Sequence, residues 1–291
     1  MNTSEIITFI GGDFRMLSCA KELSALGYKV NLFGYENYNK ELKDITFSNN
    51  LQNCINTSDI LVLPLPYSRD KNKICAAYSN KDITLDDIRQ CDLSNKVILG
   101  GCFDSNFEEK LMDKNCKIID YYLREELKVL NAIPTAEGAL AIAIIETNIT
   151  IHSSKCAVLS FGCVGRAIAR VLHLIGAEVT VIARSASALS KAASLGYKTE
   201  HINNIKNALM NKDFIFNAIP EIIITKEILD CIDKKTLIID LASKPGGVDV
   251  NASENLGIRT IYAPSLPNKY APITAGEYLA KTINHILKGV E

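Results

Sequence analysis

The chain lacks an excess of charge of either sign. It has 32 Lys and Arg residues against 33 Asp and Glu residues, for a formal net charge of -1. It also lacks a long apolar run, because its most apolar stretch, residues 138–145, is much too short to cross a bilayer. We therefore expect no nucleic-acid partner and no membrane span.

The residues that build metal sites and disulfide frameworks are scattered. The four histidines share no metal-ligand spacing, and the nine cysteines are an odd number with no Cys-x-x-Cys pair. The first nine residues contain neither a basic nor an apolar leader region. These features predict no metal and no signal peptide, and they favour reduced thiols in a cytoplasmic protein.

The chain contains the same order of predicted strands and helices in its first and second halves. A strand at 5–10, a helix closed by Gly27 and a strand at 29–33 match a strand at 156–159, a helix at 166–175 closed by Gly176 and a strand at 178–182. The later matching strands are 59–66 with 213–220, 96–100 with 236–240, and 117–121 with 258–262. Alternating helices and apolar strands predict an α/β fold, with two Rossmann-like doubly wound parallel-sheet domains and a cleft between them.

A glycine-containing turn follows the first strand of the second half, as Ser160-Phe-Gly162-Cys-Val-Gly165. In a Gly-x-Gly-x-x-Gly turn, the second glycine lets pyrophosphate approach the backbone and the third lets the helix pack closely on the strand. Ser160 replaces the first glycine, whereas Gly162 and Gly165 keep the other two positions. With pyrophosphate on the N-terminus of the helix at Arg166, this turn predicts a dinucleotide site.

The aligned turn of the first half differs at both important positions. Asp13 stands opposite Gly162, and Met16 stands opposite Gly165. A carboxylate at the point of pyrophosphate approach repels the ligand. We expect the first domain to bind something other than a dinucleotide.

The residues that follow the predicted strand 178–182 indicate which cofactor binds. An NAD site usually has an acidic residue there, which binds the ribose 2′-hydroxyl. This chain has Arg184 and Ser185 instead, which can pair with a 2′-phosphate. We therefore favour NADP, with NAD possible.

Later loops at strand ends complete the predicted crevice. They are residues 217–220, the glycine-containing 240–247 and the proline-rich 263–276. The predicted cofactor-binding residues are Ser160, Phe161, Gly162, Cys163, Val164, Gly165, Arg166, Arg184, Ser185, Asn217, Ala218, Ile219, Pro220, Leu241, Ala242 and Pro264.

We place the domain boundary near Pro134. Residues 1–133 then form an N-terminal Rossmann-like domain for substrate or partner. Residues 134–291 form the NADP-binding Rossmann domain, with an inter-domain helix at 135–146 and a C-terminal helix at 274–287.

Several strings together resemble the family of dipicolinate synthase A-type subunits. They are Gly11-Gly-Asp-Phe-Arg15, Leu63-Pro-Leu-Pro66, Ile133-Pro-Thr-Ala-Glu-Gly138, Phe161-Gly-Cys-Val-Gly-Arg166, Asp240-Leu-Ala-Ser-Lys-Pro-Gly-Gly247 and Leu266-Pro-Asn-Lys-Tyr-Ala-Pro-Ile-Thr-Ala-Gly276. They run nearly end to end. The departures are Ser160, where glycine is commoner, and Ser265 and Asn268, in a loop that usually carries more glycine.

The resemblance implies an oxidoreductase that works during sporulation with a flavoprotein-like partner, the B-type subunit of dipicolinate synthase. Its substrate would be a small cyclic dicarboxylate, dihydrodipicolinate or its hydrated precursor. Loss of a hydride to NADP and of a proton would leave the aromatic pyridine of dipicolinate. A homo- or hetero-oligomer is expected.

Residue roles follow from chemistry and position at strand ends. Arg15 and Arg69 are candidates to bind substrate carboxylates, with Ser243 nearby in a family string. Thr135 and Glu137 either cap the inter-domain helix or touch substrate at a hinge. The catalytic candidates, as base or as partner of a carboxylate, are Lys244, Lys269 and Asp13.

Two other functions stay open. The chain could be a non-catalytic nucleotide-binding scaffold of that complex, because no single residue is a convincing base. It could also be a stand-alone two-domain NAD(P)-dependent dehydrogenase of a small acid.

Overall fold

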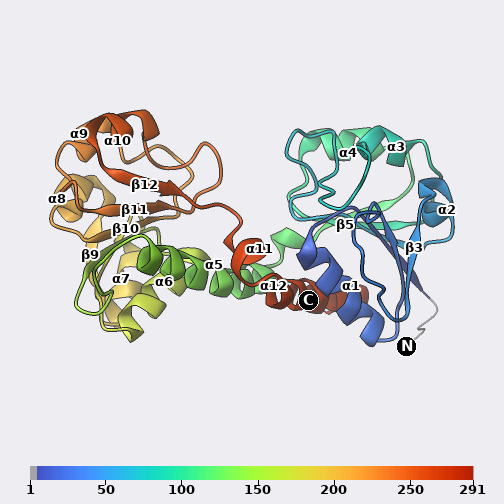
Figure 1. The fold of residues 1–291 in the computed structure, drawn as a ribbon, viewed down its shortest axis with the longest axis horizontal. Coiled ribbons are helices and arrows are strands. Elements are labelled where there is room, and N and C mark those ends of the chain that lie inside the picture. Colours follow the sequence, from blue (N-terminus) through green and yellow to red (C-terminus); the bar gives the residue numbers. More distant parts are fainter. Residues whose placement is uncertain (1–4, 291) are drawn as a thin grey trace. The chain divides into compact units, whose positions relative to one another are not determined.

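The computed structural model describes residues 5–290, which fold as two compact units. The first unit contains the chain up to Leu130 and again from Pro272 onward, and the second is Asn131–Ala271. Each unit has its own six-stranded sheet and its own covering helices (Figure 1). The predicted α/β class with two Rossmann-like domains is confirmed.

The first sheet has the strand order β3-β2-β1-β4-β5-β6, and neighbouring strands pair in parallel. Its strands are β1 (Ile6–Ile10), β2 (Lys29–Phe33), β3 (Ile45–Ser48), β4 (Ile60–Val62), β5 (Val97–Gly100) and β6 (Lys117–Asp120). Its helices are α1 (Phe14–Ala25), α2 (Leu51–Asn56), α3 (Leu85–Arg89), α4 (Ser105–Leu111), the 3-10 turn η1 (Tyr121–Leu123) and α12 (Pro272–Leu287). Such an order is doubly wound, and the chain reverses direction across the sheet between β1 and β4.

The second sheet repeats this plan, with the order β12-β11-β10-β7-β8-β9 and parallel pairing. Its strands are β7 (Lys155–Leu159), β8 (Glu178–Ala183), β9 (Lys198–His201), β10 (Phe214–Asn217), β11 (Leu237–Asp240) and β12 (Arg259–Tyr262). Its helices are α6 (Cys163–Leu174), α7 (Ala186–Ser194), η2 (Ile202–Asn204), α8 (Ile205–Leu209), α9 (Lys226–Leu229), α10 (Val250–Leu256) and α11 (Leu266–Tyr270). The equivalent point of reversal lies between β7 and β10.

Alternate strand residues supply the two faces of each sheet. In β7, Cys156 and Val158 belong to one buried cluster, whereas Ala157 and Leu159 belong to another. All four side chains are fully buried. Because successive side chains of a strand point to opposite faces, continuous apolar strands need helices on both sides.

The helix expected at 135–146 is longer than predicted. The structure has α5 (Glu125–Ile145), with Pro134 inside it and the acidic Glu125 and Glu126 in its first turn. Pro134 suggests a boundary because proline usually lies in the first turn of a helix. Buried Leu127 and Ala132 extend the packed face ahead of the proline, so the helix persists through it.

By length and composition, α5 could cross a membrane, but 39% of its most apolar window is buried inside the protein. Ala136, Ala139 and Ala143 belong to the core of the second unit. One face of the helix is therefore packed in a core, and its apolar run is longer than the sequence stretch 138–145 suggested.

The C-terminal helix belongs to the first unit, contrary to the prediction that places it in the second. It begins at Pro272, and its residues Leu279, Ala280 and Ile283 are buried in the core of the first unit against α1. Gly276 makes this packing possible, because a Cβ there would lie 2.3 Å from the Cβ of Ser18. Amphipathic periodicity reveals a buried face but not which core receives it.

Candidate functional site

The glycine-containing turn joins β7 to α6 in the second unit. Ser160 has φ +88°, a left-handed conformation that favours glycine, and its N–H donates to the carbonyl of Ile182 over 2.9 Å. A Cβ on Gly165 would lie 2.2 Å from the Ser160 carbonyl oxygen. The third glycine of the motif is therefore required by packing of the helix on the strand end, as predicted.

Gly162 has a different environment from Gly165. A Cβ there would meet only the Ser160 hydroxyl oxygen, at 3.6 Å, so the protein itself leaves the space open. Gly162 is the N-cap of α6 and makes no side-chain capping bond. Helix α6 actually starts at Cys163, three residues before the predicted Arg166, so its first amide groups follow the glycine directly. Open space beside the start of a helix suits an anion, because the positive end of the helix dipole lies there.

Two buried polar side chains join the ends of β10 and β11. Asn217 donates from Nδ2 to Asp240 Oδ1 over 2.8 Å, and both residues are at most 2% exposed. The other carboxylate oxygen of Asp240 accepts the N–H of Gly247 over 2.8 Å. A Cβ on Gly247 would lie 2.0 Å from Asn217 Nδ2. The two side chains thus hold the loop after β11 against the end of β10.

Asp240 was missed as an individual site residue, although its loop was singled out. The sequence feature that could have identified it is its position: Asp240 ends an otherwise apolar strand and precedes a Pro-Gly-Gly run. Desolvation raises the pKa of the Tyr262 phenol, and the negative charge of the nearby Asp240 carboxylate raises it further. Ser243 and Lys244 of the same loop are exposed.

The other predicted cofactor residues lie at the same edge of the sheet, because the carboxyl ends of parallel strands share one edge. Phe161 and Ala242 are buried there. Cys163, Val164, Ala218, Ile219 and Leu241 are half-buried, and Arg166 and Pro220 are exposed. The Arg166 guanidinium contacts Cys163 Sγ at 3.6 Å.

Arg184 and Ser185 follow β8 directly and are both exposed. The Ser185 hydroxyl oxygen caps α7 by accepting the N–H of Ala188 over 3.4 Å, which leaves its own O–H proton to donate. The Arg184 carbonyl oxygen lies 3.1 Å from His201 Nε2. These contacts fix the backbone of the pair, while the Arg184 side chain is exposed.

In the first unit, Asp13 and Arg15 bind one another. The Asp13 carboxylate caps α1 by accepting the N–H of Arg15 over 3.0 Å, and the Arg15 guanidinium reaches it at 2.6 Å. Arg15 is only 7% exposed and also donates to the Leu65 carbonyl oxygen over 2.6 Å. The sequence-based roles of Asp13 as base and Arg15 as substrate ligand stay predictions, and this mutual pairing speaks against them.

The glycines of the first unit's turn are packed against the protein's own chain. A Cβ on Gly11 would lie 2.9 Å from the Cys75 carbonyl oxygen, and the Ala77 N–H donates to the Gly12 carbonyl over 3.0 Å. The Tyr35 hydroxyl donates to the Gly11 carbonyl over 2.6 Å, and burial together with Asp13 raises its pKa. The backbone of this turn is thus held by the protein's own side chains and by the segment around Cys75.

The remaining predicted residues are spread over several elements. Arg69 is exposed, in the segment that follows β4. Thr135 and Glu137 lie inside α5, so the helix-cap alternative is wrong, because the helix begins ten residues earlier. The Thr135 hydroxyl donates to the Asn131 carbonyl over 2.8 Å, and Glu137 is exposed.

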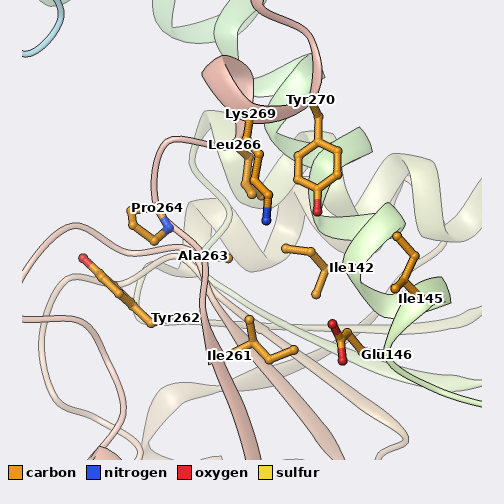
Figure 2. A pocket seen from close by; sticks show the side chains of 10 residues that line it. All are labelled: Ile142, Ile145, Glu146, Ile261, Tyr262, Ala263, Pro264, Leu266, Lys269 and Tyr270. Carbon is orange, nitrogen blue, oxygen red and sulfur yellow. The ribbon is translucent and has the colours of Figure 1, made fainter. Parts of the chain in front are cut away.

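Lys269 and Pro264 line a pocket of about 300 Å³ in the second unit, between α5, β12 and α11 (Figure 2). Ser265, next to Pro264, has φ +58°. Two of the three positions where the sequence departs from the family's glycines, Ser160 and Ser265, therefore have left-handed backbones. Within the described part of the chain, no residue of the turn 160–166 lines this pocket.

Among residues 5–290, no group of three or more His, Cys, Asp or Glu side chains could hold a metal ion. None of the nine cysteines, all of which lie within residues 5–290, forms a disulfide, and four of them are buried.

The fold and the turn define a class: a two-unit Rossmann-type α/β protein of the dehydrogenase fold. A transhydrogenase structure from Sinorhizobium meliloti shares this fold with a TM-score of 0.71 and 15% identity, over 97% of this chain and 93% of that one. A crystal structure of the A-type subunit of dipicolinate synthase from Bacillus halodurans is much more similar, with a TM-score of 0.89 and 32% identity over 97% of each chain.

The sequence comparison agrees. Residues 6–122 match the family model of the N-terminal domain of the dipicolinate synthase A-type subunit. The A-type subunit of dipicolinate synthase from Bacillus subtilis is 31% identical over 100% of this chain and 98% of its own length. The chain belongs to the family of dipicolinate synthase A-type subunits.

Proposed function

We propose that the chain is the NADP-dependent oxidoreductase component of a dipicolinate synthase. With the flavoprotein-like B-type subunit, it would convert dihydrodipicolinate, or its hydrated precursor, to dipicolinate during sporulation. The observation that carries this proposal is the contrast within the turn of the second unit: Gly165 has no room for a side chain, whereas the space at Gly162 is open. Membership of the family of dipicolinate synthase A-type subunits supports the assignment to dipicolinate synthesis.

The turn would hold the pyrophosphate of NADP with the first amides of α6, beside the open face of Gly162. Arg184 would pair with the 2′-phosphate, and Ser185 would donate its hydroxyl proton to the same group. Asn217 and Asp240 are positioning residues, because they hold the loops at 217–220 and 241–247 at the edge where the cofactor would run. When bound, NADP supplies the hydride acceptor.

The substrate is a dicarboxylate, so the chain must supply cations and a group that removes a proton. Arg69 is exposed and suits one carboxylate, and Ser243 and Lys244 lie on the loop that Asp240 anchors. Lys244 is our candidate for the proton acceptor, since Asp13 is already paired with Arg15. A Rossmann-type protein with these features would work in the cytoplasm, as part of an oligomer with the B-type subunit.

The decisive experiment supplies the purified chain with the B-type subunit, NADP and freshly generated dihydrodipicolinate, and follows the ultraviolet absorbance of the pyridine product. NADP-dependent product supports the proposal. No product in the presence of bound cofactor and partner contradicts it.

Cofactor choice is tested separately with Arg184→Ala, and Arg170→Ala serves as the matched control because Arg170 is exposed on α6, away from the end of β8. Arg184→Ala should weaken NADP by about tenfold or more and leave NAD nearly unchanged, whereas Arg170→Ala should affect neither. Equal losses for NADP and NAD would overturn the assignment of the 2′-phosphate.

A non-catalytic scaffold is the second candidate. It is favoured by the environments of the three predicted catalytic residues, since Asp13 is paired with Arg15, and Lys244 and Lys269 are exposed rather than buried. Substrate carrying deuterium at the transferred position separates the two functions. Deuterium on the nicotinamide supports the oxidoreductase, and deuterium transfer to flavin alone supports the scaffold.

A further inference from the structure

The pocket between α5, β12 and α11 combines an apolar wall with a lysine. Ile142 of α5, Ile261 of β12 and Leu266 of α11 supply aliphatic surface on three sides of a space of about 300 Å³. Figure 2 shows the Lys269 ammonium and the Tyr270 hydroxyl pointing from α11 into the same space, toward Ile142. A small cavity that combines aliphatic walls with convergent polar groups is a common form of small-molecule site.

The charges around this pocket favour an anion at one end. No carboxylate among residues 5–290 forms an ion pair with Lys269, whose ammonium lies 5.2 Å from the ring centroid of Tyr270. At the other end, Glu146 is paired with Arg259, which also donates to the Glu146 carbonyl oxygen over 2.5 Å. Among the described side chains that line the pocket, Lys269 therefore carries the charge that has no ion-pair partner, and this charge is positive.

The same arrangement limits the ligand to a single carboxylate. A carboxylate beside Lys269 and the Tyr270 hydroxyl would gain a charge-assisted and a neutral hydrogen bond. The opposite end offers aliphatic side chains and a Glu146 carboxylate that is already paired with Arg259, so a second carboxylate there would have no free cation to pair with. A volume near the lower limit of ligand sites restricts the body to about one ring.

We propose that this pocket binds a small monocarboxylic acid with an apolar, ring-sized body. The carboxylate pairs with the Lys269 ammonium and the Tyr270 hydroxyl, and the body packs against Ile142, Ile261 and Leu266. Among the described residues, none of the turn 160–166 lines this pocket, although Pro264 and Lys269, two residues predicted for the cofactor site and for catalysis, do. The proposal itself does not depend on the proposed function, because it requires neither NADP nor a dicarboxylate.

The test uses the full chain, without cofactor, and benzoate as the probe. Isoleucine methyl groups are labelled with ¹³C, and the signals of Ile142 and Ile261 are assigned with the variants Ile142→Leu and Ile261→Leu. Benzoate is titrated to about 10 mM, which is tenfold above the dissociation constant of a weak millimolar site. The proposal expects saturable shifts of these two methyl signals.

Four comparisons make the result specific. Lys269→Met should weaken benzoate by about tenfold, and Tyr270→Phe should weaken it by about threefold while retaining the ring that packs on Gly138. Lys235→Met, on an exposed lysine in the turn before β11, should change nothing. Neutral benzamide and doubly charged benzene-1,3-dicarboxylate should bind more weakly than benzoate.

Each alternative outcome overturns the proposal. Absence of saturable shifts shows that the pocket binds no such acid. If Lys269→Met and Tyr270→Phe both bind benzoate as tightly as the wild type does, any binding does not use these two groups. Tighter binding of the dicarboxylate than of benzoate contradicts the ligand class and would assign the pocket to the dicarboxylate substrate instead.

Discussion

Asn217 donates a hydrogen bond of 2.8 Å to Asp240, and this bond joins the carboxyl ends of two neighbouring strands. Both side chains are fully buried, and the second oxygen of Asp240 holds Gly247 of the following loop. A buried polar pair of this kind is stable only when every group has a partner. The pair thus connects strand geometry to the placement of the loop that carries Ser243 and Lys244.

Asp240→Asn should loosen that loop. The new amide must turn one N–H group toward a donor, either Asn217 Nδ2 or the Gly247 N–H, so a buried hydrogen bond is lost. We expect a loss of about 2 kcal/mol in the free energy of unfolding and faster hydrogen exchange at Gly247. Asp249→Asn is the matched control, because Asp249 caps α10 and asparagine caps equally well. Unchanged exchange at Gly247 in Asp240→Asn would contradict the assigned role.

The two glycines of the turn should respond differently to alanine. Gly165→Ala places a Cβ against the Ser160 carbonyl and should destabilise the protein by about 2 kcal/mol. Gly162→Ala has room for its Cβ and should cost less than about 1 kcal/mol. If pyrophosphate approaches Gly162, this second variant should still lose NADP affinity by about tenfold. Thermal unfolding and isothermal titration measure the two effects, and full NADP affinity in Gly162→Ala would argue against the site.

Substitutions of Arg15 and Arg69 should have different effects, because Arg15 has a structural role and Arg69 is proposed to bind substrate. Arg15→Met leaves Asp13 without its partner in a largely buried place, and we expect a loss of about 3 kcal/mol in the free energy of unfolding. Arg69→Met removes an exposed side chain and should change stability by no more than about 0.5 kcal/mol, while it weakens substrate binding. Denaturant unfolding and substrate titration test the pair. Full stability in Arg15→Met, with impaired substrate binding, would restore Arg15 as a ligand.

Lys212 should make stability depend on alkaline pH. Burial, reinforced by Lys198, lowers the pKa of the Lys212 ammonium from its usual 10.5, while its Nζ donates to Thr180 over 2.8 Å. Between the lowered pKa and 10.5 the folded state binds fewer protons than the unfolded state, so the contribution of Lys212 to stability rises with pH. The free energy of unfolding of Lys212→Met minus that of the wild type should therefore fall as pH rises toward 10.5. Lys235→Met should show no such trend, and a flat difference for Lys212→Met would contradict the prediction.

Local features of the sequence allowed much of the fold to be predicted. The strands 29–33 and 178–182 were placed within one residue, because each is a short stretch rich in apolar and β-branched residues that closely follows a helix-ending glycine. The helix after the turn was placed three residues late, since α6 starts at Cys163 without a capping side chain to mark it. Pro134 misled the prediction for α5, because the packing around it outweighs the hydrogen bond that proline removes.

For the candidate site, sequence reasoning found the turn but could not assign the charged residues. Arg15 and Arg69 both follow strands in the sequence, yet one is buried in an ion pair and the other is exposed. Similarly, Lys244 and Lys269 both follow strands in the sequence, but Lys269 and not Lys244 lines the pocket between α5, β12 and α11. The direction of a long side chain depends on contacts with residues far away in the sequence.

The amino-acid sequence by itself determined the two doubly wound sheets and the turn at Ser160–Gly165, because strand and helix periodicity and glycine spacing are local properties of the chain. Only the tertiary structure decided that α12 returns to the first unit and that Gly11 is packed against the segment around Cys75. It also decided that Asp240 is a buried anchor. Each of these depends on packing between segments that are distant in sequence, and hydrophobic pattern alone does not choose between possible partners.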